Sequence, residues 1–186
     1  MAFQSTAIQG LLIFEPKVFE DSRGYFFESY NANLFKEAGL DIQFVQDNQS
    51  SSAYGVIRGL HFQQAPYAQA KLVRVLSGRI QDVAVDIREG SPTYGEVFTI
   101  ELSSDNKKQL FIPAGFAHGF SVLSEKADVL YKCDAFYNRE SEAGIRYDDP
   151  ALKIEWAIPS NAVIVSDKDR ELPTLAKCKN SFRYIV

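Results

Sequence analysis

Apolar and polar residues alternate over most of the chain in short runs, which are separated by glycine, serine, aspartate or proline. Alternation with a period of two over about four to eight residues is typical of half-buried β-strands. We expect strands at Leu11–Glu15, Tyr25–Tyr30, Phe44–Gln49, Val56–Phe62, Leu72–Leu76, Gln81–Arg88, Val97–Leu102, Gln109–Ile112, Gly119–Leu123 and Val129–Phe136. So many short strands at regular spacing predict a sandwich or barrel, because alternating strand–helix units would need longer helical segments.

One helix interrupts this β pattern. We expect it from Asn31 to Ala38, because asparagine caps helices well and Gly39 is suited to ending one. The C-terminal third is more polar, and we expect it to wrap around the barrel. The chain is therefore predicted to form a single domain over residues 1–186, with a barrel core at about 43–137.

Composition and charge exclude several classes of protein. A chain of 186 residues that is 46% hydrophobic can bury a sizeable core without disulfides or metal ions. Its net charge of −4 argues against a nucleic-acid partner, which demands a basic surface. Cys133 and Cys178 fit neither a disulfide framework nor a zinc site. We find neither a signal peptide nor an apolar run of about 18 residues, so we expect a soluble, cytoplasmic protein with no membrane partner.

The chain contains two histidines, and each follows glycine in an alternating segment. In an extended segment His61 shares a face with Gly59, while Arg58 lies on the opposite face. The missing side chain of Gly59 leaves room for a ligand beside His61. His118 follows a Pro113–Gly115 turn. For both histidines a structural, hydrogen-bonded imidazole in the core remains the alternative.

Three further side chains are candidates for the same cavity. Lys71 begins an apolar strand, where a desolvated amine needs a polar or anionic partner, although a solvated strand end is equally compatible. Tyr131 and Tyr137 fall on one face if their strand runs straight, so both could reach the cavity. Aromatic residues at alternate strand positions are also common in plain cores.

Two glycine-containing motifs resemble those of the cupin superfamily, whose fold is a double-stranded β-helix. They are Gly55-x5-His61 followed by Lys71-x6-Gly78, and Pro113-x-Gly115-x-x-His118. The resemblance implies a mainly β jelly-roll barrel with a few short helices. Metal-binding cupins place a second histidine two residues after the first and a glutamate before x6-Gly, where this chain has Gln63 and Lys71. We therefore expect no metal.

Longer motifs narrow the resemblance to the dTDP-4-dehydrorhamnose 3,5-epimerase family over residues 8–170. These motifs are Asp21-Ser-Arg23-Gly24-Tyr-Phe-Phe, Phe44-Val-Gln46-Asp47-Asn48, Arg58-Gly-Leu-His61, Lys71-Leu-Val-Arg74, Asp82-Val-Ala-Val-Asp86-Ile-Arg88 and Phe111-Ile-Pro-Ala-Gly-Phe-Ala-His118-Gly-Phe. The resemblance implies a cofactor-independent isomerase of dTDP-L-rhamnose and polysaccharide biosynthesis. Its substrate is dTDP-4-dehydro-6-deoxy-D-glucose, inverted at C3 and C5. The family is commonly dimeric, so a homodimer is expected.

The chemistry explains the catalytic residues that the resemblance implies. The protons at C3 and C5 flank a ketone, so their removal gives an enolate that can be reprotonated on the opposite face. His61 is the expected base, since imidazole titrates near pH 6.5, and Asp169 is its expected partner, with a turn or cap as the alternative. Lys71 would stabilise the enolate oxygen by up to about 3–4 kcal/mol. Tyr131 is the expected acid, and Lys71 is expected to lower its pKa.

Substrate-binding residues are also implied by the resemblance. They are Arg23, Glu28, Gln46, Asp47, Asn48, Arg58, His118, Tyr137, Glu142 and Lys168. Arg23 and Arg58 suit the diphosphate because guanidinium groups bind phosphate through two parallel hydrogen bonds. Tyr137 matches the ring that stacks on thymine. Arg23 and Glu28 lie in the N-terminal segment, which in family dimers completes the neighbouring subunit's site. For Glu142 and Lys168 a solvated surface position is the alternative.

Three other functions remain open. A related epimerase could invert only C3 or C5 of another nucleotide-linked keto-sugar. A non-catalytic cupin that binds sugar nucleotides would be expected to lack His61, Lys71 or Tyr131, and all three are present. A metal-dependent cupin oxygenase or isomerase is disfavoured by the two histidines.

Overall fold

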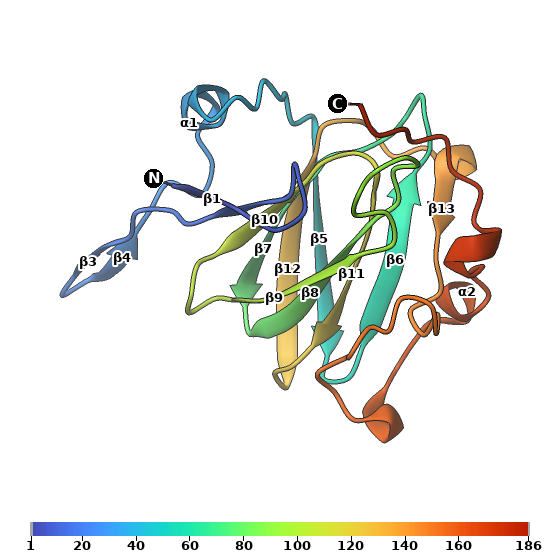
Figure 1. Cartoon of the computed structure of the whole chain (residues 1–186). Helices are drawn as coiled ribbons and strands as arrows, with labels where there is room; N and C mark the ends of the chain where they lie inside the picture. Colours follow the sequence, from blue (N-terminus) through green and yellow to red (C-terminus); the bar gives the residue numbers. More distant parts are fainter. Residues whose placement is uncertain (1, 186) are drawn as a thin grey trace.

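Two antiparallel β-sheets face each other and form the body of the protein (Figure 1). The computed structural model describes residues 2–185. The six-stranded sheet has the order β1 (Phe3–Ser5), β2 (Leu12–Phe14), β10 (Gln109–Ile112), β7 (Lys71–Ser77), β12 (Lys126–Cys133) and β5 (Gln46–Ala53). The five-stranded sheet has the order β13 (Glu142–Gly144), β6 (Ile57–Gln63), β11 (Phe116–Val122), β8 (Arg79–Asp86) and β9 (Val97–Ser103). This arrangement confirms the predicted barrel of short strands.

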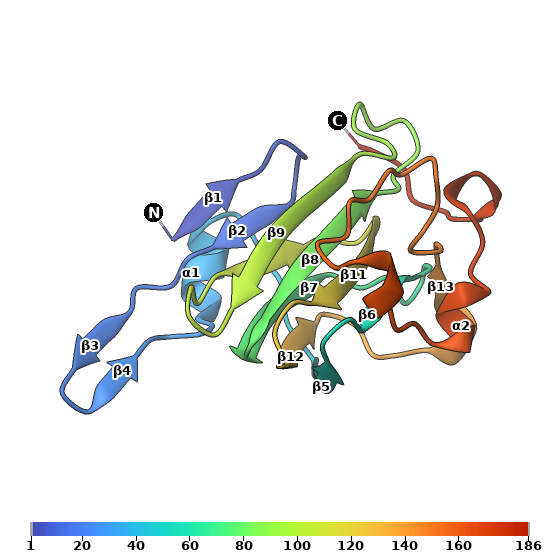
Figure 2. The ribbon, with the colours of Figure 1, turned by 90° about the horizontal axis from the view of Figure 1, so that it is seen from below.

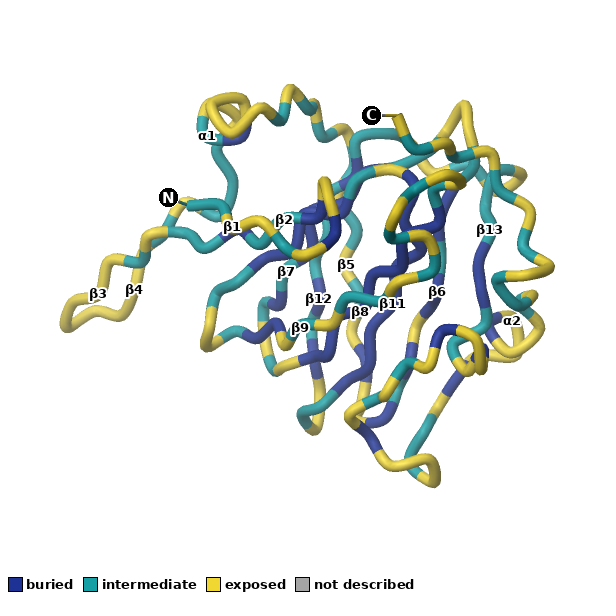
Figure 3. The backbone as a smooth tube through the Cα atoms, viewed as in Figure 1, coloured by how far each residue is buried: buried dark blue, intermediate teal, exposed yellow. Residues whose placement is uncertain are grey.

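The core lies between the two sheets. Val73 and Val129 of the six-stranded sheet pack in one buried cluster with Ala84 and Phe120 of the five-stranded sheet. β8 and β11 are buried along nearly their whole length (Figure 3). Alternating strand positions therefore place one set of side chains in the barrel and the other set against an outer layer.

The outer layer on the five-stranded sheet is the C-terminal third of the chain. Val83 and Val85 of β8 pack in a second cluster with Leu152, Trp156 and Phe182. This part of the chain therefore packs on the outside of the five-stranded sheet. The segment also carries the short helix α2 (Asp167–Arg170), which lies beside β13 (Figures 1 and 2), and the 3₁₀ turns Arg139–Ser141, Ser160–Ala162 and Leu175–Lys177.

The predicted N-terminal helix is confirmed as α1 (Ala32–Glu37). The Asn31 side chain accepts a hydrogen bond from the Asn33 N–H at 3.0 Å, and Gly39 follows with a positive φ. Phe35 anchors the helix in a cluster of aromatic rings on the outside of the six-stranded sheet. Neither helix of the described range has the length and apolar character needed to cross a membrane.

A two-stranded hairpin, β3 (Phe19–Asp21) and β4 (Gly24–Phe26), projects away from the barrel (Figures 1 and 2). Every residue of both strands is exposed (Figure 3). Its side chains include three large hydrophobic residues, Phe19, Tyr25 and Phe26. Exposed aromatic residues gathered on a projecting element are typical of a surface that another protein covers.

Each of the ten predicted strands has a counterpart, but some bounds differ. The strand expected at Tyr25–Tyr30 is only Gly24–Phe26, and the strand expected at Val129–Phe136 is Lys126–Cys133. Where β12 ends, the Asp134 carboxylate accepts a hydrogen bond from the Ala70 N–H at 2.7 Å, so a side chain takes the place of a backbone acceptor there. The strand therefore does not run straight to Tyr137, so the condition under which Tyr131 and Tyr137 would share a strand face is not met. β1, β3, β13 and α2 were not predicted, since elements this short carry little periodicity.

Candidate active site

A cavity of about 500 Å³ opens at one end of the barrel, between the two sheets and α2. Most of the expected site residues line it, namely Gln46, Asn48, Arg58, His61, Lys71, His118, Tyr131, Tyr137, Glu142, Lys168 and Asp169. These residues come from β5, β6, β7, β11, β12, β13, α2 and the segment that follows β12. Facing sheets thus bring together side chains that are far apart in the sequence.

An irregularity in β6 decides which of its side chains enter the cavity. His61 pairs with His118 of β11, and Arg58 pairs with Phe120, so β6 contains one more residue than β11 over this step. Such a β-bulge turns side chains that would alternate onto the same face. Arg58 and His61 both line the cavity as a result. The expectation that Arg58 lies on the face opposite His61 is wrong for this reason.

β6 and β11 lie unusually close together at the bulge, and each has a glycine there. Gly59 has a φ of +122°, and a Cβ added to it would lie 2.6 Å from the Gly119 Cα. A Cβ added to Gly119 would lie 2.6 Å from the Arg58 carbonyl oxygen. Both positions therefore exclude any side chain, and Gly59 also needs a backbone conformation that other residues avoid.

His61 is paired with Asp169, as the family resemblance implies. Its Nε2 lies 2.8 Å from Asp169 Oδ1, and the second carboxylate oxygen accepts from the Gly59 N–H at 3.1 Å. The Ser166 side chain caps α2 and accepts from the Asp169 N–H, which fixes the orientation of this carboxylate.

The charge of Asp169 determines how His61 is protonated. Burial acts to raise the pKa of Asp169, but hydrogen bonds from His61, Gly59 and Ser166, together with the charge of His61, hold it below its ordinary value. An ionised carboxylate can only accept hydrogen bonds. Nε2 of His61 must therefore donate to Asp169, which leaves Nδ1 as the nitrogen with a free lone pair.

Lys71 lies in the same cavity, almost completely buried. Among the described residues its one hydrogen bond goes to the His61 carbonyl oxygen at 3.4 Å, so two N–H groups remain for a ligand. Burial lowers the pKa of Lys71, and the charges of Asp82 and Glu142 partly oppose this.

Tyr131 stands on the opposite wall from His61, because β12 and β6 belong to different sheets. Its ring centroid is 5.9 Å from the Lys71 Nζ. Burial raises the pKa of Tyr131, and the cation that opposes this is Arg58. The expected lowering of the Tyr131 pKa by Lys71 is wrong, because desolvation of the phenolate dominates and the opposing positive charge is that of Arg58. The phenol is consequently a protonated donor at neutral pH.

A second histidine–aspartate pair lies deeper in the barrel. Nε2 of His118 lies 2.6 Å from Asp82 Oδ1, and Asp82 is fully buried. Asp82 Oδ2 has no hydrogen-bond partner among the described residues. The sequence motifs include Asp82 without assigning it a role. A carboxylate inside an apolar strand needs a partner, which is the signal that could have identified it.

Tyr137, Glu142 and Lys168 form a connected group at the rim of the cavity. The Tyr137 hydroxyl donates to Glu142 Oε2 at 2.9 Å, and the Lys168 Nζ donates to both Glu142 oxygens at 2.7 Å. Burial acts to raise the pKa of Glu142, but the hydrogen bonds from Lys168 and Tyr137 hold it below its ordinary value. The rim thus presents an aromatic ring beside a cation.

Three expected residues do not reach the cavity of their own chain. Arg23 is at the tip of the β3–β4 hairpin, where its side chain is 88% exposed and pairs with Asp21. Glu28 accepts a hydrogen bond from Asn31 near the start of α1. Asp47 alternates with its neighbours on β5, so it faces outward and binds Lys132 at 3.0 Å.

The cavity is also lined by residues for which no site role was expected, namely Gln49, Ser50, Gln63, Gln69 and Ser166. Ser50 and Gln63 could have been found by continuing the alternation from Asn48 and His61. Nothing in the sequence singles out Gln69. The Gln63 amide is bound to backbone groups of the chain. Within residues 2–185, no three His, Cys, Asp or Glu side chains gather in a way that could hold a metal ion.

Comparison with known proteins identifies the class and then the family. The two-sheet barrel is of the cupin type, as in the solved epimerase structures that it matches. The family model for dTDP-4-dehydrorhamnose 3,5-epimerase matches residues 5–177. A relative of that name from Shigella flexneri is 54% identical over 165 residues, which are 88% of this chain and 90% of the relative. The chain therefore belongs to the dTDP-4-dehydrorhamnose 3,5-epimerase family.

Solved structures give the same result. The dTDP-6-deoxy-D-glucose-3,5-epimerase of Legionella pneumophila, in complex with dTDP-4-keto-L-rhamnose, has a TM-score of 0.95 at 47% identity, covering 99% of this chain and 98% of its own. A 3′-monoepimerase from Streptomyces bikiniensis, in complex with dTDP-quinovose, has a TM-score of 0.86 at 32% identity, covering 92% of this chain and 86% of its own.

Proposed function

We propose that this protein inverts C3 and C5 of dTDP-4-dehydro-6-deoxy-D-glucose and so forms dTDP-4-dehydro-L-rhamnose. The observation that carries the proposal is the cavity itself, in which His61 of one sheet, paired with Asp169 of α2, faces Tyr131 of the other sheet. Lys71 lies beside both walls. The sugar of the Legionella complex, dTDP-4-keto-L-rhamnose, is the product that such a reaction would give.

In the proposed reaction, Nδ1 of His61 takes the proton from the carbon beside the ketone. The electrons of the broken C–H bond move into an enolate, whose oxygen accepts hydrogen bonds from Lys71. The Tyr131 phenol then gives a proton to the opposite face of the carbon. Solvent returns a proton to the phenolate and takes up the proton that His61 removed, so both side chains are restored. The substrate is neither oxidised nor reduced, so these side chains are sufficient for the chemistry.

Binding of the nucleotide is proposed to fall to the rim. Arg58 is suited to the diphosphate because its side chain lines the cavity and a guanidinium binds phosphate well. Its Nε donates to the Ser52 hydroxyl at 3.0 Å, which orients the guanidinium and leaves its terminal nitrogens for the ligand. Tyr137 would stack on thymine, with Glu142 and Lys168 fixing the position of its hydroxyl. His118, Gln46 and Asn48 are further proposed contacts.

We also propose a homodimer in which each β3–β4 hairpin reaches the cavity of the other subunit. In its own chain the hairpin leaves Arg23 remote from the cavity and Phe26 67% exposed. A partner copy would cover the aromatic residues and would use Arg23, Glu28 and the outward-facing Asp47 for substrate or subunit contacts. The two free cysteines are in keeping with a cytoplasmic location, which is likewise part of the proposal.

A second candidate is an enzyme that inverts only one carbon, since the Streptomyces monoepimerase has the same fold. The test is to incubate the purified protein with dTDP-4-keto-6-deoxyglucose and to determine the product configuration by NMR. Inversion at both C3 and C5 is expected. Inversion at C3 alone would establish the second candidate, and an unchanged sugar would contradict both.

A further inference from the structure

Two glutamine side chains of the cavity wall form hydrogen bonds with the segment that carries Tyr137. Gln69 donates from Nε2 to the Ala135 carbonyl oxygen at 2.8 Å. Gln46 of β5 accepts from the Tyr137 N–H at 2.9 Å. Both side chains thus bind backbone groups, which fixes the path of the chain without using the Tyr137 side chain, whose hydroxyl binds Glu142.

A third glutamine, Gln63, makes more of these contacts. It lies at the end of β6 and is only 4% exposed. Its Oε1 accepts from the Asn138 N–H at 2.7 Å, and its Nε2 donates to the Phe136 and Tyr67 carbonyl oxygens at 3.2 and 2.7 Å. The amide of Gln63 therefore holds the backbone on both sides of Tyr137.

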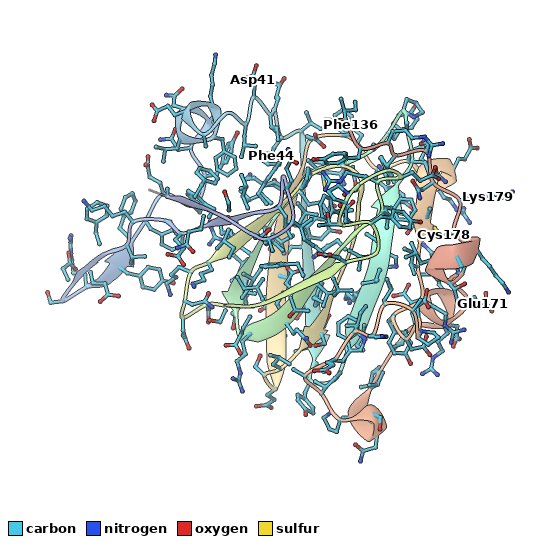
Figure 4. All side chains as sticks on the ribbon, viewed as in Figure 1. Asp41, Phe44, Phe136, Glu171, Cys178 and Lys179 are labelled. Atoms are coloured by element: carbon cyan, nitrogen blue, oxygen red, sulfur yellow. The ribbon has the colours of Figure 1, made fainter. Side chains whose placement is uncertain are left out.

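Apart from the hydrogen bond that the Tyr137 hydroxyl donates to Glu142, the segment at Phe136 and Tyr137 is held mainly by these amide contacts to its backbone. The β12 ladder ends at Cys133, and the side chains of Phe136 and Tyr137 are 65% and 55% exposed. Phe136 lies at the same end of the barrel as Phe44, where the chain enters β5 (Figure 4). Apolar burial contributes little at such exposure, so directional hydrogen bonds, above all those of the buried Gln63 amide, hold the backbone that carries the ring.

We propose that Gln63 is a positioning residue that presents Tyr137 to the base of the nucleotide, a proposal that rests on the proposed binding of dTDP-sugars at this rim. Gln63 does not touch the reacting carbons in this role. It acts by pre-organising an exposed ring, which saves the entropy that a mobile segment loses when a ligand binds.

A control substitution at a similar glutamine can show whether Gln63 positions Tyr137 or only stabilises the fold. Gln81 of β8 is also nearly buried, donates to the Glu155 carbonyl oxygen at 2.9 Å and accepts from the Ala157 N–H at 2.7 Å. It therefore clamps backbone in the same manner, but it does not line the cavity. Gln81→Leu is the control for loss of stability alone.

The experiment measures dTDP binding by calorimetry, together with kcat and KM. Gln63→Leu is expected to raise the Kd for dTDP and the KM about tenfold, equivalent to about 1.4 kcal/mol, with kcat at saturation within about twofold of wild type. Gln81→Leu should leave both Kd and KM unchanged. If Gln63→Leu does not fold, Gln63→Glu provides the same test, because it keeps the shape and the acceptor while replacing the donor.

The double variant with Tyr137→Ala tests the route of the effect. Because Gln63 acts through Tyr137, the double variant should bind dTDP no more weakly than Tyr137→Ala alone. Two results would overturn the positioning role of Gln63 while leaving the rim as the nucleotide site. One is wild-type affinity for dTDP in folded Gln63→Leu, and the other is a double variant whose increase in Kd is the product of the two single increases. Wild-type affinity for dTDP in Tyr137→Ala would instead refute the proposed contact between Tyr137 and the base, and with it the positioning role of Gln63.

Discussion

His61 donates one ring nitrogen to Asp169 and keeps the other for the cavity. This division depends on an ionised Asp169, whose pKa is below its ordinary value. The sequence contains both residues, but 108 positions separate them, and no spacing rule connects such a pair. The pairing was inferred from the family resemblance, because the sequence alone is equally compatible with a turn or capping role for Asp169.

Asp169→Asn should reduce kcat about 10²–10⁴-fold with little change in KM. The amide of the new side chain would donate to Nε2 of His61, so Nδ1 would carry the proton and could not act as a base. Steady-state kinetics with the keto-sugar measures this. A variant with wild-type kcat would remove Asp169 from the mechanism.

The same substitution has a signature in stability. The folded-state pKa of Asp169 is lower than its unfolded value of about 3.9, so the ionised carboxylate stabilises the protein above that pH. This contribution is lost as the pH falls through the folded-state pKa. The difference in unfolding free energy between wild type and Asp169→Asn should therefore shrink below about pH 4, as measured by urea unfolding.

Tyr131→Phe tests the acid on the opposite wall. The buried phenol has a raised pKa and is a protonated donor, so its loss should impair inversion, particularly at C5, while deprotonation by His61 continues. In heavy water the variant should exchange the C3 proton but accumulate little doubly inverted product. Normal inversion at both carbons would show that another group or water delivers the proton.

The elements were largely predictable from alternation, because strands such as β5 have one face toward the barrel and one toward solvent. The bulge in β6 was not. One extra residue in a strand leaves the hydrophobic pattern almost unchanged, yet it brings Arg58 onto the same face as His61. The end of β12 was missed for a similar reason, because it falls where a single side chain, Asp134, takes over a backbone hydrogen bond.

Gly59→Ala should reveal what the bulge requires. The added methyl meets the Gly119 backbone at 2.6 Å in a positive-φ conformation, so we expect a loss of about 2–4 kcal/mol in unfolding free energy and loss of activity. Gly39→Ala is the matched control, because Gly39 has a φ of +82° but nothing within 4 Å of its added Cβ. It should cost about 1 kcal/mol and keep activity. Equal losses in both variants would rule out the close approach as the cause.

The whole molecule is a barrel with two appendages, a C-terminal layer that packs on it and a hairpin that does not. The shared buried cluster between barrel and C-terminal layer supports the prediction of a single domain, which stays a prediction. The position of Arg23 could not be derived from one chain, because a projecting hairpin acquires its surroundings only from a second molecule.

Phe26→Glu should weaken the proposed dimer at least about 30-fold, because aromatic residues at the centre of an interface commonly contribute about 2 kcal/mol or more. KM should rise in parallel, since Arg23 and Glu28 would be withdrawn from the partner's cavity. Sedimentation velocity measures the first effect and kinetics the second. Tyr94→Glu, which changes an exposed aromatic residue outside the hairpin, is the control. A monomeric wild type would contradict the hairpin exchange.

The most direct measurement of the proposed mechanism follows deuterium from heavy water into dTDP-4-keto-6-deoxyglucose by NMR, with wild type and with His61→Asn. The wild type should incorporate deuterium at both C3 and C5. His61→Asn keeps the size of the side chain and should still bind the dTDP-sugar, but it should not exchange the C3 proton, because no other imidazole is paired with Asp169. Exchange at C3 at the wild-type rate in this variant would contradict the assignment of the base.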